Sequence, residues 1–440
     1  SECFHASTEA PSDKTAHGTE GPLQVTYRDP FLPCAKAFVE ASQRRGAVHA
    51  DYNGVERPEK VVNFHQNTIT TDGKRHTAYD AFVRPVLDSR PNLTVMANTH
   101  ASRVIIDGAP RHACTGVEVI GADGETQVLS AGTEVVLACG AYQTPKLMLR
   151  SGIGPREELA AAGVECVINS PYVGKNLKDH ICTCIPVASD AFLSLGELIH
   201  GTGAGEDKSA VMEYMSTGKG LLMSSLYEAS AFYNTGVQKE SMHSHDAQIS
   251  IIASMGDPGF WARLGIPLDP AEYDYEKVFN MDKGCGFLIA TLDQPLSEGS
   301  VALGGADPFA PPRIENNYLS PDTGDLQALV AICKESAAIG EEMGGEVVLP
   351  ADLMEAYKGD LSNDQLWEDF IVRRASSIYH PVSSCKMGSV LDYECSVLDV
   401  DGLRVADASV MPNIPSGNTM APSIMIGERV AGFMKQAHGL

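Results

Sequence analysis

The sequence predicts a mixed α/β fold of the α+β type, in which helices pack against sheets in two domains. The chain has 440 residues, 43% of them hydrophobic and 20% charged, which is enough for two cores and typical of a soluble globular protein. Short strands with alternating apolar residues crowd the first half, and strands separated by helices fill the second half. A strand, a turn and an amphipathic helix then close the chain.

The first 140 residues contain two predicted helices and a series of short strands. A helix over 33–45 ends at Gly46, an extended segment covers 60–71, and a second helix covers 77–87 with Thr77 as its cap. We expect its apolar side chains to lie inside, namely Tyr79, Phe82, Val83 and Val86. Alternating patterns then predict strands at 93–97, 102–106, 114–120, 126–130 and 134–137.

The last of these strands runs on into a glycine turn. An apolar run over 135–139 meets Gly140, and a helix is predicted from Thr144, so the backbone can approach a ligand closely at this turn. The elements predicted after it are helices over 155–163, 325–341, 363–374 and 423–434, and strands over 246–249, 285–292 and 403–406. Those between residues 246 and 374 predict an antiparallel sheet backed by helices.

Charge and cysteine usage exclude several classes of protein. The formal charge of −24 disfavours nucleic acid and anionic membranes as partners, because both would repel the chain. The sequence contains no run of about twenty uncharged apolar residues, so we expect no transmembrane span. The 11 cysteines lack metal-ligand spacing and are expected to be reduced core thiols. The segment 243–246 (His-Ser-His-Asp) contains metal-ligating residue types, but it is expected to be a surface loop. We therefore expect no zinc or iron site.

Two loop motifs near the C-terminus carry the strongest functional signal. Residues 378–388 read Ile-Tyr-His-Pro-Val-Ser-Ser-Cys-Lys-Met-Gly, and residues 416–422 read Ser-Gly-Asn-Thr-Met-Ala-Pro. Between them, 403–409 read Leu-Arg-Val-Ala-Asp-Ala-Ser. His380 and Asn418 therefore flank one strand–turn–helix unit, which can aim both side chains at one substrate atom and present a helix N-terminus to an anionic group.

These segments closely resemble the C-terminal signature of the glucose–methanol–choline (GMC) oxidoreductases, which are FAD-dependent. A second signature of that family is matched by residues 140–155, Gly-Ala-Tyr-Gln-Thr-Pro-Lys-Leu-Met-Leu-Arg-Ser-Gly-Ile-Gly-Pro. Residues 174–180 (Gly-Lys-Asn-Leu-Lys-Asp-His) resemble a third family stretch, which closes the strand meander. The resemblance implies a GMC-type fold, with a Rossmann-like FAD-binding domain and a substrate domain built on an antiparallel sheet.

The resemblance also implies an alcohol, choline among the candidates, as a small-molecule substrate that is oxidised to an aldehyde or ketone. His380, whose ordinary pKa lies near neutrality, suits the base that takes the hydroxyl proton, and Asn418 can orient the same oxygen. The residues that it places at the FAD are Ala101, Cys139, Gly140, Ala141, Asp407, Ala408, Ser409, Thr419 and Met420.

The chain departs from the family pattern at its start. Residues 17–25 resemble a segment that normally lies well inside the chain, after the G-x-G-x-x-G turn that holds the FAD pyrophosphate. The cluster Gly201-Thr202-Gly203-Ala204-Gly205 is the only glycine cluster of similar look, and we interpret it as a flexible loop. We therefore expect only part of the FAD-binding domain here, completed by a separate N-terminal FAD-binding fragment or chain.

Four segments and two alternative functions follow from this interpretation. We assign residues 1–72 mostly to the substrate domain, and 186–388 to the same domain. We assign 73–185, which contains the β-meander, and 389–440 to the FAD-binding domain. The alternatives are a flavin-bound lyase or decarboxylase on the same scaffold, and a non-catalytic subunit of a larger complex. The sequence identifies neither the substrate, the electron acceptor nor the compartment.

Overall fold

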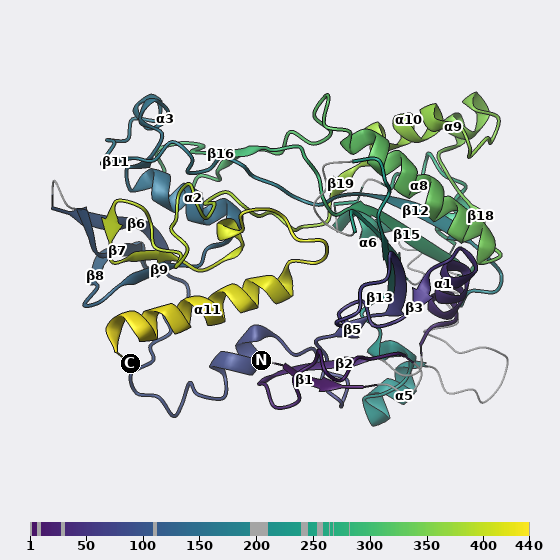
Figure 1. The fold of residues 1–440 in the computed structure, drawn as a ribbon, viewed down its shortest axis with the longest axis horizontal. Helices are drawn as coiled ribbons and strands as arrows, with labels where there is room; N and C mark the ends of the chain where they lie inside the picture. The colour runs from purple at the N-terminus through teal and green to yellow at the C-terminus, as the bar shows by residue number, and fades with distance from the viewer. Residues whose placement is uncertain are drawn as a thin grey trace. The chain divides into compact units, whose positions relative to one another are not determined.

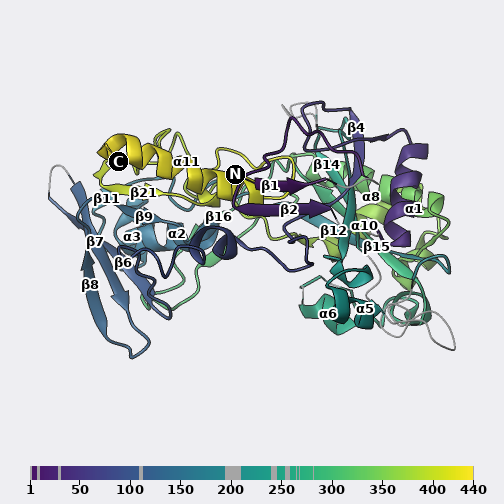
Figure 2. The ribbon, with the colours of Figure 1, turned by 90° about the horizontal axis from the view of Figure 1, so that it is seen from below.

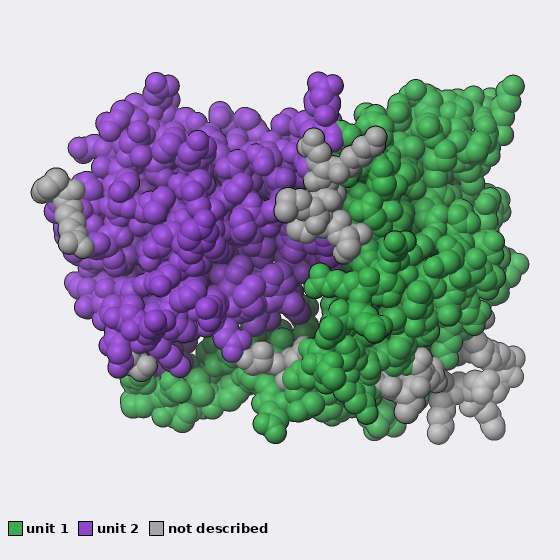
Figure 3. Space-filling view, in the orientation of Figure 1, with its two compact units in different colours: residues 1–92, 181–294, 324–377 green, residues 93–180, 295–323, 378–440 purple. Residues whose placement is uncertain are grey.

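The fold is taken from a computed structural model of the chain. The structure describes residues 2–6, 10–27, 31–108, 112–193, 210–238, 245–252, 258–263, 265–266, 268–280 and 282–439. The glycine cluster 201–205 and residues 243–244 of the expected surface loop lie outside these ranges. The chain divides into two compact units, each coloured separately in Figure 3. Unit 1 comprises Ser1–Asn92, Ile181–Gln294 and Gly324–Ser377, and unit 2 comprises Leu93–His180, Pro295–Thr323 and Ile378–Leu440.

Unit 1 is built on an eight-stranded sheet that is antiparallel except between β3 and β4 (Figures 1 and 2). Its order is β18-β12-β15-β14-β13-β4-β3, and β19 also pairs with β12. The strands are β3 (Val48–His49), β4 (Lys60–Phe64), β12 (Ile181–Ala188), β13 (Tyr227–Tyr233), β14 (Ala247–Ile252), β15 (Cys285–Leu292), β18 (Glu346–Val347) and β19 (Ser376–Ser377). The predicted antiparallel sheet backed by helices is thus confirmed.

Helices bury this sheet. All side chains of β14 and β15 are buried, as expected for central strands covered on both faces. The longest helix of the unit, α8 (Asp325–Glu342), packs on the sheet, and its Cys333 Sγ lies 3.2 Å from Thr183 Oγ1 of β12 (Figure 1). The other elements of unit 1 are β1 (Glu2–His5), β2 (Leu23–Tyr27), β5 (Gln66–Asn67), α1 (Pro33–Arg44), η1 (Tyr79–Val83), α5 (Ala210–Thr217), η2 (Leu221–Met223), α6 (Pro258–Arg263), α7 (Tyr275–Val278), α9 (Ala351–Ala356) and α10 (Asp364–Arg374).

Unit 2 combines small sheets with helices around one core. A four-stranded sheet, in the order β20-β7-β6 with β8 on β7, contains three of the five strands expected in the meander. The last expected strand, β9, instead pairs in parallel with β21. The strands are β6 (His100–Asp107), β7 (His112–Ile120), β8 (Thr126–Ser130), β9 (Val135–Leu137), β10 (Ile153–Gly154), β11 (Ile168–Asn169), β16 (Ser300–Ala302), β17 (Arg313–Glu315), β20 (Val400–Asp401) and β21 (Leu403–Val405). The helices are α2 (Gly140–Arg150), α3 (Arg156–Ala161), the 3₁₀ turn η3 (Ala408–Val410) and α11 (Met420–His438).

Two elements predicted near residue 92, where the chain passes from unit 1 to unit 2, do not form as expected. The strand expected at 93–97 is an exposed coil, because none of its residues pairs with another strand among those described. The helix expected over 77–87 is reduced to the single π-helical turn η1, since Pro85 cannot donate a hydrogen bond there. The N-cap residue of this turn is Ala78 rather than the expected Thr77, although Thr77 Oγ1 accepts from the Asp80 amide at 3.2 Å. Tyr79 and Phe82 are exposed rather than inside.

A buried ion pair fastens the parallel strands β9 and β21 to the last helix. Arg404 of β21 donates from Nε to Glu134 Oε2 at 2.6 Å, and both side chains are 7% exposed. His438 at the end of α11 lies 2.6 Å from Glu134 Oε1. Burial raises the pKa of Glu134, but the hydrogen bonds from Arg404 and His438 outweigh burial and hold that pKa below its ordinary value.

We predict that Glu134→Gln destabilises the protein while Glu394→Gln barely does. Glu394 is 58% exposed and lies 3.9 Å from the same arginine, so it is a matched control. Removing the buried carboxylate leaves the Arg404 charge poorly compensated and should cost about 2–4 kcal/mol, whereas the exposed pair should cost less than about 1 kcal/mol. Urea denaturation of the two variants measures the difference, and equal midpoints would contradict the structural role given to Glu134.

Candidate active site

Two of the motifs found in the sequence lie side by side in unit 2. The amides of Lys178 and Val382 each donate to the carbonyl oxygen of the other residue, at 3.2 and 2.9 Å. The Ile378 amide donates to the carbonyl oxygen of His180 at 3.2 Å. This pairing of 174–180 with 378–384 brings His180 beside His380.

A chain of hydrogen bonds runs through these two histidines. The two Nδ1 atoms of His180 and His380 lie 2.9 Å apart, with the rings edge to face. His180 Nε2 lies 2.9 Å from the carbonyl oxygen of Pro415, and His380 Nε2 lies 3.3 Å from Asn418 Nδ2. His180 is completely buried. The two residues predicted to be catalytic, His380 and Asn418, are therefore adjacent. The loop 415–418 contacts both ends of this series of hydrogen bonds, through Pro415 and Asn418.

The backbone of His380 is held by the neighbouring motif. Asp179 Oδ1 accepts from the His380 amide at 2.9 Å, and its Oδ2 accepts from the Tyr318 hydroxyl at 2.6 Å. The preceding residue, Tyr379, has a φ of 66°, which is uncommon for a residue with a side chain and is found where the surroundings fix the backbone. Asp179 therefore contributes to the fixed position of the imidazole.

The His380 side chain is neutral at physiological pH. Burial disfavours the charged imidazolium and lowers the pKa of His380 to about 4. A neutral imidazole has one nitrogen that accepts a proton, so His380 is in the state that a general base requires.

Asp407 joins the two predicted cofactor loops by accepting three hydrogen bonds. Its Oδ2 accepts from the Gly140 amide at 3.0 Å and from Thr144 Oγ1 at 2.5 Å, and its Oδ1 accepts from the Ser409 amide at 2.8 Å. Gly140 begins α2, earlier than the predicted start at Thr144, and has a φ of 83° that favours glycine. Asp407 thus holds the strand end of 403–409 against the N-terminus of α2.

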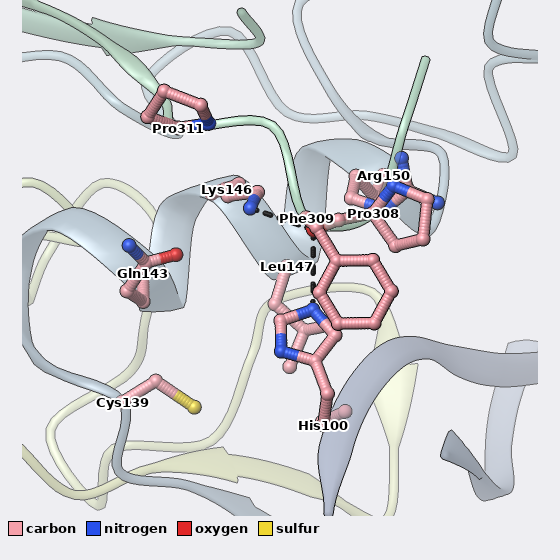
Figure 4. Close-up of a pocket in the computed structure, with 10 residues that line it drawn as sticks. His100, Cys139, Gln143, Lys146, Leu147, Arg150, Pro308, Phe309 and Pro311 are labelled. Carbon is pink, nitrogen blue, oxygen red and sulfur yellow. Dashed lines mark hydrogen bonds between the residues drawn. The ribbon is translucent and has the colours of Figure 1, made fainter. Parts of the chain in front are cut away.

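A cavity of about 520 Å³ opens beside this helix, and Ala101 and Cys139 line it. Figure 4 shows Gln143, Lys146 and Arg150 on α2 and the ring of Phe309 beside His100. The rings of His100 and Phe309 are 4.7 Å apart, and Pro308 O accepts from His100 Nε2 and Lys146 Nζ at 3.1 and 2.8 Å. Aromatic rings together with basic side chains are suited to a nucleotide, which has a stacking base and anionic phosphates.

The remaining predicted cofactor residues differ in accessibility. Ala141 is buried, and its carbonyl oxygen accepts from Ser384 Oγ at 2.5 Å. Ser409 is also completely buried in η3, so its side chain offers no surface to a ligand in this conformation, whereas Ala408 beside it is half-buried. Thr419 and Met420 stand at the start of α11, where no side chain caps the helix, and Met420 is 52% exposed.

The described residues also contain no group of three or more His, Cys, Asp or Glu side chains that could hold a metal ion. Within the same ranges, no helix is long and apolar enough to cross a membrane.

Comparisons with known proteins assign the chain to a family. Two models described as GMC oxidoreductase match it, one over residues 5–182 and the other over residues 295–427. An uncharacterised GMC-type oxidoreductase of Mycobacterium tuberculosis is 32% identical over 432 residues, which cover 95% of this chain and 73% of the relative. The chain belongs to the GMC oxidoreductase family.

This membership confirms the resemblance and makes the protein an oxidoreductase. An alcohol dehydrogenase (acceptor) of Pseudomonas putida is 30% identical over 430 residues, covering 94% of this chain and 70% of that one. A formate oxidase structure from Aspergillus oryzae covers the whole chain with a TM-score of 0.82 and 24% identity, over 77% of its own length. This likeness confirms the mixed α/β fold.

The comparisons do not support one expectation about the N-terminus. The N-terminal family model matches residues 5–182, so nothing in them points to a separate N-terminal FAD-binding fragment or chain. The segment 17–25, whose resemblance had prompted the expectation, lies within the matched range.

Sequence reasoning missed four residues of this GMC oxidoreductase site: Asp179, His180, Tyr318 and Pro415. The first two belong to the 174–180 motif, which was recognised only as the end of the meander. Its Asp-His ending, beside a second His-containing motif, was the available signal. No motif included Pro415, and the hydrogen bonds of Tyr318 and Pro415 to the site depend on the fold.

We predict that His380 titrates near pH 4 and that its neutral form stabilises the fold. Its pKa is lower in the folded than in the unfolded state, so the unfolded chain binds more protons between about pH 4 and 6.5, and stability should fall as the pH decreases through that range. One such group contributes a slope of up to about 1.4 kcal/mol per pH unit. His380→Ala should therefore flatten the pH dependence of the unfolding free energy by up to this amount. An unchanged slope, or an NMR titration of His380 near 6.5, would contradict the prediction.

Proposed function

We propose that this GMC oxidoreductase oxidises an alcohol to an aldehyde or ketone, with His380 as general base and Asn418 orienting the hydroxyl oxygen. The observation that supports this best is the 3.3 Å separation of His380 Nε2 and Asn418 Nδ2. Two nitrogens this close can both reach one substrate oxygen at about 3 Å, within the range that proton transfer requires. The alcohol dehydrogenase relative supports the substrate class.

The cofactor is FAD, as the family and the FAD-containing formate oxidase structure indicate. When bound, it accepts a hydride from the carbon that carries the hydroxyl group. The residues present fit such a group. The cavity beside α2 combines aromatic rings with basic side chains, and the space where a side chain of Gly140 would start is empty to 4 Å.

We propose that Ala101, Cys139, Gly140 and Ala141 hold the cofactor together with 407–409 and the start of α11 at Thr419 and Met420. The uncapped N-terminus of α11 presents backbone amides and a positive dipole end, which stabilise an anionic group nearby. In this arrangement Asp407 acts mainly by holding the loops, because its carboxylate already accepts three hydrogen bonds.

The chain's own part of the reaction is a proton transfer. Asn418 Nδ2 donates a hydrogen bond to the substrate oxygen, and the hydroxyl proton moves to His380 Nε2. The oxygen then forms the carbonyl, and the imidazolium later returns the proton to solvent. Because all these residues and the proposed cofactor residues belong to unit 2, we assign cofactor binding and the proton transfer to unit 2.

Anaerobic mixing of the flavin-loaded enzyme with ethanol, 1-octanol, cyclohexanol, benzyl alcohol and choline tests the proposal. At least one should bleach the oxidised flavin absorbance, and none doing so would contradict alcohol oxidation. His380→Ala should slow the bleaching by about 10²–10⁴-fold and Asn418→Ala by about 10²-fold. Both variants should retain bound flavin.

The matched control is His112→Ala, which removes a histidine from strand β7 of the same unit. It should reduce flavin at close to the wild-type rate. A His380→Ala variant that also does so would remove His380 from the mechanism.

A further inference from the structure

We propose that His180 is a positioning residue, which fixes the proton of His380 on Nδ1 and leaves Nε2 free to act as the base. This inference rests on the proposed function, because it matters only if His380 is the base. It extends that function to a residue of the 174–180 motif, for which no role had been inferred beyond closing the meander.

The carbonyl oxygen of Pro415 determines the direction of the hydrogen-bond chain. A carbonyl oxygen can only accept, so the contact of 2.9 Å to His180 Nε2 requires a hydrogen on that nitrogen. A neutral imidazole carries a single N–H, and therefore His180 Nδ1 has a lone pair and no hydrogen.

The same reasoning passes from His180 to His380. His180 Nδ1 lies 2.9 Å from His380 Nδ1, so His380 must supply the hydrogen between them. Because His380 is neutral, its Nε2 is then unprotonated, and this nitrogen is the one beside Asn418 Nδ2. Asn418 can donate to it until a substrate oxygen takes its place.

The opposite direction of donation is unfavourable at this site. If His180 carried its hydrogen on Nδ1, its Nε2 lone pair would face the Pro415 carbonyl oxygen at 2.9 Å with no hydrogen between them. His180 is 0% exposed, so water does not reach it to relieve that contact. An amide side chain could flip to suit either direction, but a backbone carbonyl cannot, and this makes Pro415 decisive.

The arrangement also favours the protonated base that the reaction forms. Once Nε2 takes the hydroxyl proton, His380 Nδ1–H still donates to His180 Nδ1, and a hydrogen bond from a charged donor is stronger than one from a neutral donor. The loop 415–418 therefore acts twice: Pro415 sets the tautomers through His180, and Asn418 orients the oxygen.

Two substitutions of nearly equal shape separate this role from a merely structural one. His180→Asn places an acceptor oxygen close to the position of Nδ1, whereas His180→Leu has the same branching and no acceptor. Both lose the imidazole ring. A structural role therefore predicts similar losses, but a tautomer-fixing role predicts a large loss for Leu and a partial rescue by Asn.

The readout is anaerobic flavin reduction in the holoenzyme, with benzyl alcohol or choline as the probe, whichever is more active on the wild type. His180→Leu should lower the limiting rate constant by about 10–100-fold, because the His380 Nδ1–H loses its buried acceptor and the proton is free to occupy Nε2. His180→Asn should recover at least about fivefold of that loss. The half-saturating alcohol concentration and the flavin content should stay close to those of the wild type.

Equal limiting rates in the two variants, or a loss confined to alcohol affinity, would overturn the inference. Failure of the proposed function itself is distinguishable, since it would appear as a fast His380→Ala variant. If His380→Ala is slow and both His180 variants are as fast as the wild type, His380 is the base and His180 does not position it.

Discussion

The candidate active site depends on one hydrogen bond, from His180 Nε2 to the carbonyl oxygen of Pro415. Because the acceptor is a backbone carbonyl in a fixed loop, the direction of donation cannot reverse, and the protons on both histidines follow from it. In the proposed mechanism, this constraint leaves the lone pair of the base His380 on a defined nitrogen, Nε2. It also links residue 180 to a loop more than 200 residues away, which explains why the site needs the complete fold of unit 2.

Asp407 has an equivalent role at the proposed cofactor site of the unit. Its carboxylate accepts from Gly140, Thr144 and Ser409, so two sequence signatures far apart in the chain are joined at one buried group. A carboxylate that accepts several hydrogen bonds keeps its position at little cost, because each donor compensates for part of its lost hydration. The two connections, one at Asp407 and one at His180, hold the loops on which the proposed FAD and alcohol sites depend.

Much of the fold could be predicted from the sequence, because runs of apolar and β-branched residues between turn residues indicate strands whether or not both faces are buried. The strands at 285–292 and 126–130 have the bounds expected from their patterns, and α8 differs by one residue. The expected strand at 93–97 failed because an apolar pattern does not supply a partner strand. The expected helix over 77–87 does not continue beyond Val83 because Pro85 has no backbone N–H to donate. Domain membership was harder to predict from the sequence. Residues 295–323 and 378–388 were expected in the substrate domain, but they lie in unit 2. The assignment of a substrate domain itself stays a prediction.

Only the part of the candidate site that lies in local motifs could be predicted from the sequence. His380 and Asn418 stand in local motifs, so they could be named, but His180 and Pro415 gain their roles only from long-range contacts that no local pattern records. Neutron diffraction from crystals of the flavin-loaded enzyme, exchanged into D₂O near pH 7, tests the account most directly. It predicts deuterium on Nε2 of His180 and Nδ1 of His380, and none on Nε2 of His380. Deuterium on Nε2 of His380 would contradict it.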